Sequence, residues 1–95
     1  MDGRAELKVE SGKLLRADVS YGDRIEHVSL HGDFFVYPEE GLDTVEDALD
    51  GADAAADEQE LADRVRQAVD ADTRLVGFDA ADVARVVREA VRDGE

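Results

Sequence analysis

Residues 32–38, Gly-Asp-Phe-Phe-Val-Tyr-Pro, are the stretch that most constrains how this chain can fold. They hold two of the three Phe, one of the two Tyr and the only Pro of an acidic 95-residue sequence. A Phe or Tyr side chain removes roughly 150–250 Å² from water when buried, so this stretch should anchor a core or a partner surface. Gly32 has wide backbone freedom and Pro38 cannot continue a central strand. We therefore expect a sheet to end here and helices to follow.

Apolar and polar residues alternate in the chain before this corner, which predicts three antiparallel strands. The expected strands cover residues 5–9, 13–21 and 24–31. A three-residue loop, Glu10-Ser11-Gly12, with Gly12 in the left-handed conformation, would pair Leu7 with Leu15 and keep apolar residues together.

A two-residue turn at residues 22–23 is expected to join the second and third strands, since Gly comes first as a type II′ turn requires. This turn would pair Ala17 with Val28 on the apolar face. On the opposite face it would set Asp18 beside His27. Such a sheet has one apolar face that needs cover.

Three later segments show helical spacing, and each opens with two acids three residues apart, the pattern of a capping box. The acidic pairs are Asp43 with Glu46, Asp57 with Glu60, and Asp79 with Asp82. The apolar stripe of the last segment comprises Val83, Val86, Val87, Ala90 and Val91. Residues 75–78 are expected to be a short apolar link that enters the core. The sequence thus predicts one α+β domain over residues 1–95, a three-stranded antiparallel sheet followed by three helices packed on one face.

Composition excludes several classes of function. The chain has no Cys, which excludes disulfides, thiolate metal sites and Cys nucleophiles. A net charge of −14, from 25 acidic and 11 basic residues, argues against nucleic acid and anionic membranes as partners. No apolar run approaches the roughly 20 residues that span a bilayer, and no signal segment is apparent, so we expect a cytoplasmic protein. The Lys-poor, acid-rich surface favours a halophilic setting, where salt screens self-repulsion.

The acidic charge is unevenly distributed along the sequence. Residues 1–32 have a net charge of −1, whereas the remaining 63 residues have a net charge of −13. The N-terminal part is therefore the better candidate for meeting another molecular surface.

The chemically active side chains form no self-contained active site in the sequence. Asp18 beside His27 is a candidate acid–base pair, but a cross-strand polar contact is the simpler interpretation. His27 and His31 would lie about 13 Å apart on one strand, too far to bind one metal ion. Lys13 follows Gly12 without a Walker pattern, so it is only a weak phosphate signal. The carboxylates show no calcium-loop spacing.

Phe34 and Phe35 pose a choice, because adjacent residues of an extended segment point to opposite faces. One ring can enter the core, and the other must be covered by a helix or by a partner. The sequence leaves open which ring does which, and Asp33 is as well explained by hydrogen bonds within the turn.

Four blocks of sequence carry a family resemblance. They are residues 12–16 (Gly-Lys-Leu-Leu-Arg), 32–40 (Gly-Asp-Phe-Phe-Val-Tyr-Pro-Glu-Glu), 45–51 (Val-Glu-Asp-Ala-Leu-Asp-Gly) and 75–78 (Leu-Val-Gly-Phe). On these blocks the chain resembles the C-terminal accessory domain of bacterial and archaeal lipoate–protein ligases. The resemblance implies a SufE/NifU-like α+β fold without that fold's sulfur chemistry.

The resemblance also implies a non-catalytic accessory subunit that works in a heterodimer with a separate catalytic subunit. In such a ligase, lipoate and ATP give lipoyl-adenylate, and the lipoyl group then passes to a lysine of an acceptor domain. ATP and lipoate would be bound in the complete ligase, with no cofactor, metal, nucleic acid or membrane bound by this chain alone. The expected partner interface comprises Lys13, Arg16, Asp33, Phe34 and Phe35.

Two alternatives come from other functional classes. The chain could be a free-standing adaptor, unrelated to lipoylation, that binds another protein through an exposed Phe. It could also be a small enzyme that uses Asp18 and His27.

Overall fold

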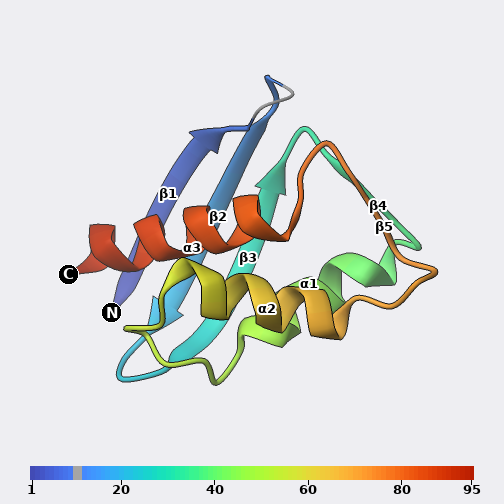
Figure 1. Cartoon of the computed structure of the whole chain (residues 1–95). Coiled ribbons are helices and arrows are strands. Elements are labelled where there is room, and N and C mark those ends of the chain that lie inside the picture. Colours follow the sequence, from blue (N-terminus) through green and yellow to red (C-terminus); the bar gives the residue numbers. More distant parts are fainter. Residues whose placement is uncertain (10–11) are drawn as a thin grey trace.

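A computed structural model describes residues 1–9 and 12–95 (Figure 1). Within these residues the chain forms a three-stranded antiparallel sheet of order β1-β2-β3, a two-stranded antiparallel sheet of β4 and β5, and three helices. The elements are β1 Asp2–Lys8, β2 Leu14–Tyr21, β3 Ile25–Gly32, β4 Phe35–Tyr37, α1 Glu40–Leu49, α2 Glu58–Ala68, β5 Arg74–Val76 and α3 Ala80–Gly94. The α+β class, the three-stranded sheet and the three helices are confirmed. The two-stranded sheet was not predicted.

The helices cover one face of the three-stranded sheet (Figure 1). Helix α3 packs across β1 and β2, α1 packs on β3, and α2 lies against both α1 and α3. All five apolar residues predicted for α3 are buried. The hydroxyl of Tyr21 in β2 donates to the carbonyl of Val91 at 2.7 Å, and burial raises the pKa of this tyrosine. This bond fixes α3 to the sheet.

Across residues 1–9 and 12–95, no helix has the length and apolar character needed to cross a membrane.

Helices α2 and α3 begin at the predicted acids. The Asp57 carboxylate accepts a hydrogen bond from the Glu60 amide at 2.8 Å. At α3 both bonds of the capping box form, with Asp79 accepting from the Asp82 amide at 2.9 Å and the Asp82 carboxylate accepting from the Asp79 amide at 3.1 Å. These local bonds satisfy backbone N–H groups that a helix start leaves unpaired.

The predicted start of α1 at Asp43 is wrong, because the helix already begins at Glu40. The Gly41 amide donates to the Pro38 carbonyl at 2.9 Å, which sets the first turn earlier. The carboxylate expected to close the capping box, that of Glu46, instead accepts the Leu30 amide of β3 at 2.7 Å. Glu46 thus accepts a long-range hydrogen bond from β3 in place of the local bond that would have capped its own helix.

The predicted pairing of the first two strands is confirmed. Leu7 lies opposite Leu15, and Ala5 lies opposite Ala17. Gly12 has φ +85°, the left-handed conformation expected at the end of the loop. The rest of that predicted loop, Glu10 and Ser11, lies outside the described residues.

The predicted pairing of the second and third strands is wrong by two residues. Asp18 lies opposite Ser29 and not His27, and the ladder has an irregularity between Ser20 and Tyr21. The third strand begins at Ile25, whose amide donates to the carbonyl of Ala52 at 2.8 Å. A shift of two residues leaves every side chain on its predicted face, so the core is unaffected.

Strands β4 and β5 form a short ribbon that lies away from both termini (Figure 1). The predicted apolar link over residues 75–78 is confirmed in part. Phe78 is buried and Leu75 packs partly against the core, whereas Val76 is 43% exposed. The ribbon therefore has an inner face toward the core and an outer face toward solvent.

Candidate functional site

The corner between β3 and β4 joins three parts of the chain. Gly32 has φ +152°, and a Cβ at this position would collide with the carbonyl oxygen of Leu14. The next amide, that of Asp33, donates to the same carbonyl at 3.1 Å. Only glycine allows this close approach, which fixes the start of β4 against β2.

The five residues predicted for the partner interface gather around this corner. Four of them line a depression of about 370 Å³, namely Lys13, Asp33, Phe34 and Phe35. Arg16 lines a neighbouring depression of about 200 Å³ that shares Asp33. The structure brings these residues together from β2, β4 and the corner between β3 and β4. Their role at an interface stays a prediction.

The two Phe residues have different surroundings. Phe34 is half-buried, and its ring centroid lies 4.6 Å from that of Phe78. Phe35 is 58% exposed and stacks on Tyr37, with centroids 6.3 Å apart and an interplanar angle of 18°. Sequence reasoning missed Tyr37 and Val76 as members of this surface. For Tyr37 the signal was present, because Tyr37 follows Phe35 by two residues and residues two apart on a strand share a face.

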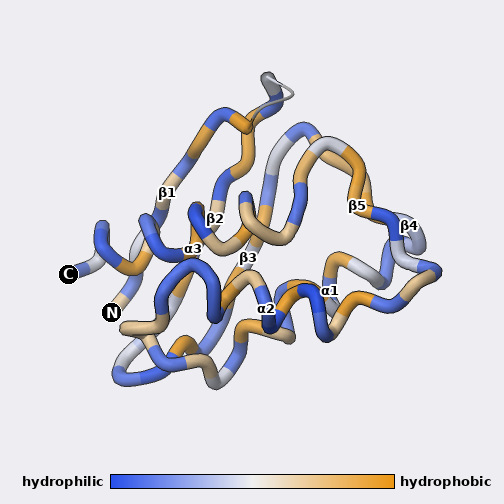
Figure 2. The backbone as a smooth tube through the Cα atoms, in the orientation of Figure 1, coloured by the Kyte–Doolittle hydropathy of each residue, from blue (hydrophilic) through white to orange (hydrophobic). Residues whose placement is uncertain are grey.

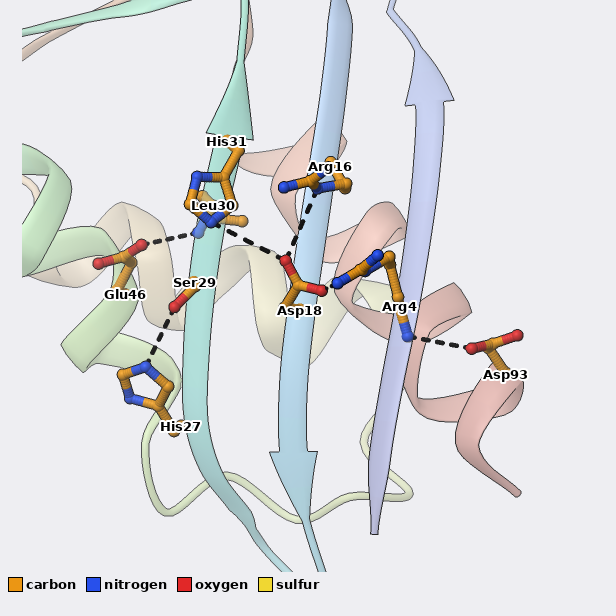
Figure 3. Close-up of polar contacts among 9 residues, drawn as sticks. All are labelled: Arg4, Arg16, Asp18, His27, Ser29, Leu30, His31, Glu46 and Asp93. Atoms are coloured by element: carbon orange, nitrogen blue, oxygen red, sulfur yellow. Dashed lines mark hydrogen bonds and ion pairs between the residues drawn. The ribbon is translucent and has the colours of Figure 1, made fainter.

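The open face of the three-stranded sheet carries a polar network centred on Asp18 (Figure 3). Its carboxylate accepts a hydrogen bond from Arg4 Nε at 2.5 Å and lies 3.6 Å from Arg16 Nε and 3.8 Å from His31 Nε2. The Arg4 hydrogen bond is the main cause that lowers the pKa of Asp18, and the same contact raises the pKa of Arg4. These contacts favour a structural role for the carboxylate.

The candidate acid–base pair of Asp18 and His27 is not assembled. The His27 Nε2 atom lies 3.1 Å from the hydroxyl of Ser29, within hydrogen-bond distance, whereas the Asp18 carboxylate faces the two arginines and His31 (Figure 3). The register shift moved His27 opposite Ser20. Among residues 1–9 and 12–95, no three His, Cys, Asp or Glu side chains cluster closely enough to hold a metal ion.

Carboxylates cap both outer edges of the three-stranded sheet (Figure 3). Glu46 of α1 accepts the Leu30 amide on β3, and Asp93 of α3 accepts the Arg4 amide on β1 at 3.0 Å. Unpaired edge amides are templates for pairing with another chain, and a carboxylate on the edge discourages this. The outer face of β4 and β5 instead exposes Phe35, Tyr37 and Val76.

Comparison with known proteins relates this chain to a solved structure. No protein-family model and no curated protein matches the sequence of this chain. A chain from the structure of an archaeal lipoylation system, comprising a bi-partite lipoate protein ligase and its E2 lipoyl domain from Thermoplasma acidophilum, is similar in structure, with a TM-score of 0.74 and 25% sequence identity. The match covers 93% of the present chain and 96% of the other.

Proposed function

We propose that this chain is the non-catalytic accessory subunit of a bi-partite lipoate–protein ligase. The observation that carries the proposal is the structural similarity to one chain of such a system, over nearly the full length of both chains. The Gly-Asp-Phe-Phe block at residues 32–35 and its neighbouring blocks support the same assignment from the sequence.

The chain would act by completing a reaction chamber whose chemistry belongs to the catalytic subunit. Lipoyl-adenylate is a reactive mixed anhydride that must be kept from water until the acceptor lysine arrives. A rigid surface closing over that site would exclude water and position the reactants. In this proposal the corner residues Lys13, Arg16, Asp33 and Phe35 lie at or near the contact, and Phe34 holds the corner in place from within.

The test is reconstitution with a lone lipoate–protein ligase catalytic subunit from the same genome. Formation of lipoyl-adenylate from ATP and lipoate is measured with and without this chain, followed by transfer to a lipoyl acceptor domain. We expect the chain to raise the rate of adenylate formation and to show no turnover alone. An unchanged rate, with both proteins folded, would remove the proposal.

The same experiment separates a second role within lipoylation, that of the acceptor. An acceptor is covalently lipoylated on lysine, and this chain has only Lys8 and Lys13. Mass spectrometry of the chain after the reaction should show no added lipoyl group. A lipoylated Lys8 or Lys13, lost in the Lys→Arg variant, would assign the chain as substrate instead.

The adaptor alternative would give a third result. An adaptor unrelated to lipoylation would neither bind the catalytic subunit nor change its rate, and would still present the exposed Phe35. Binding to the catalytic subunit, measured by sedimentation velocity, therefore distinguishes the two.

A further inference from the structure

The outer face of the β4–β5 ribbon is an exposed apolar surface. Phe35 lies opposite Val76 and Tyr37 lies opposite Arg74, so these four side chains share one face. Phe35 is 58% exposed, Tyr37 54% and Val76 43%. We call these three apolar residues the ribbon patch. The ribbon lies at the end of the molecule opposite the two termini and includes hydrophobic segments (Figures 1 and 2).

The inner face of the ribbon is fixed to the core, which holds the ribbon patch in place. Val36 is 8% exposed and Leu75 packs partly against the core, and these two residues face each other across the strands. The stacking of Phe35 on Tyr37 orders the two rings further. A surface that is already ordered loses little conformational entropy on binding.

The size and chemistry of the ribbon patch suit the centre of a protein interface. More than half of a Phe and a Tyr, each contributing roughly 150–250 Å² when buried, leaves on the order of 200 Å² of aromatic surface in solvent. A stable interface buries about 800 Å² per partner, with an apolar centre inside a polar rim. Aromatic side chains at such a centre often supply most of the binding energy.

The charges around the ribbon patch disfavour a second copy of this chain as its occupant. Acidic residues stand in the segments that lead into and out of the two strands, namely Asp33, Glu39, Glu40 and Asp72, all of them exposed. The nearby basic residues are Arg74 in β5 and Lys13, whose side chain approaches Gly77. Two such faces pressed together would set acids against acids, and each chain already has a net charge of −14. A partner surface with Lys or Arg around an apolar pocket is complementary.

We propose that the ribbon patch docks into an apolar pocket with a Lys- and Arg-rich rim on the catalytic subunit of the ligase. This inference rests on the proposed function and narrows its interface. Contact is made by Phe35, Tyr37 and Val76, of which only Phe35 was among the interface residues predicted from the sequence. Phe34 does not touch the partner and acts as a positioning residue through Phe78.

The experiment measures the dissociation constant of the complex with the catalytic subunit by isothermal titration calorimetry. Phe35→Ser and Tyr37→Ser should each weaken binding by about thirtyfold or more, the size of an interface hot spot. Val76→Thr keeps the β-branched shape and should weaken binding less. The matched control is His27→Ser, which also removes an exposed ring, since His27 is exposed and lies in β3 of the three-stranded sheet. We expect that control to change the dissociation constant less than threefold.

The charged rim gives a second measurement that needs no large change in the apolar surface. Glu39→Lys with Glu40→Lys should slow association with a basic partner, most at low salt, because rim charges act mainly on the association rate. Arg74→Gln should leave the association rate unchanged or raise it. Thermal melting of each variant checks that the fold is intact.

The outcomes separate this inference from the proposed function. If the wild-type chain binds and stimulates the catalytic subunit while Phe35→Ser and Tyr37→Ser bind as tightly, the docking surface is overturned and the proposed function stands. A tenfold or larger loss for His27→Ser, with Phe35→Ser unaffected, moves the interface to the open face of the three-stranded sheet. A dimer of this chain that Phe35→Ser dissociates would make a second copy the occupant. If the wild-type chain neither binds nor stimulates, the proposed function fails first.

Discussion

Buried and exposed residues alternate along the strands of both sheets, but the exposed faces of the two sheets differ in chemistry. In β2 the apolar set lies under the helices, and the opposite face carries Arg16, Asp18 and Ser20. In the β4–β5 ribbon the inner residue Val36 is buried, but the opposite face carries Phe35 and Tyr37. A polar face can stay in contact with water at little cost in free energy. An exposed aromatic face gains stabilisation when another surface covers it and removes it from water. The difference indicates that the three-stranded sheet builds the fold and that the ribbon is available for binding.

The largest expected effect contrasts a core residue with a ribbon residue. Leu49 in α1 is fully buried, so Leu49→Ala should cost about 2–5 kcal/mol of unfolding free energy. Val76→Ala on the outer face of the ribbon should cost less than about 0.5 kcal/mol. Urea unfolding followed by circular dichroism measures both. Equal losses would mean that the ribbon is as much a part of the folding core as the helices are.

A smaller effect is expected at the junction between ribbon and core. Phe34 is half-buried against Phe78, so Phe34→Ala should cost about 2 kcal/mol, less than a fully buried Phe. Hydrogen exchange at Val36 should then accelerate more than exchange in α3, because the ribbon loses its anchor locally. Phe35→Ala is the matched control and should leave both measurements unchanged. Uniform acceleration across the chain would show that ribbon and core unfold as one unit.

The third prediction concerns the β3 edge of the three-stranded sheet, where the Glu46 carboxylate accepts a backbone amide. Glu46→Ala removes the acceptor of the partly buried Leu30 amide and should cost about 1–3 kcal/mol. Glu46→Gln retains a carbonyl acceptor and should recover part of that loss. Asp93→Ala, at the exposed contact with the Arg4 amide, should cost less. If Glu46→Ala has no effect on the urea midpoint, the bond is dispensable and this edge is not sealed by it.

The acidic charges allow a fourth prediction, on salt. From about 0.1 M to 1 M KCl the Debye length falls from about 10 Å to about 3 Å, which should screen repulsion among the carboxylates. We expect the melting temperature to rise by on the order of 5 °C, which corresponds to about 1 kcal/mol for a domain of this size. Asp43 and Asp47 are exposed and one turn apart in α1, so replacing both by Asn should flatten the rise. A melting temperature that stays constant with salt would count against a halophilic setting.

The features that the sequence predicted correctly depend on nearby residues. The helix starts at Asp57 and Asp79 are made by bonds that span three residues. The pairing of Leu7 with Leu15 follows from alternation across one short loop. In each case the decisive contact is close in the sequence, so residue type and spacing were sufficient.

The features that the sequence could not predict depend on distant contacts. The register of β3 changes where Ile25 bonds to Ala52, and α1 starts early while Glu46 serves β3. The ribbon pairs two three-residue strands, one before α1 and one after α2 in the sequence. Strands this short show too little alternation of apolar and polar residues to be recognised. The same distance explains the candidate site. The corner block, Tyr37 included, was identifiable from the sequence, but Val76 joined it only when β4 met β5.

The smallest expected effect is at Asp18, on the polar open face of the three-stranded sheet. Its pKa is lowered mainly by the Arg4 hydrogen bond, so the folded state holds the ionised form more strongly than the unfolded chain does. That stabilisation is fully present above the unfolded pKa of about 3.9 and is lost as the pH falls through that value toward the lower folded pKa. Because solvent screens the carboxylate, Asp18→Asn should cost less than about 1 kcal/mol at pH 7. The difference between the melting temperatures of wild type and variant should shrink as the pH falls below the unfolded pKa of about 3.9, measured in molar KCl and alongside Ser29→Ala as a control on the same face. A difference that persists unchanged at pH 3 would mean that Asp18 acts through packing and not through charge.

Loss of ligase stimulation in Asp18→Asn with an unchanged melting temperature would give the open polar face a functional role and would break the division between the two sheets.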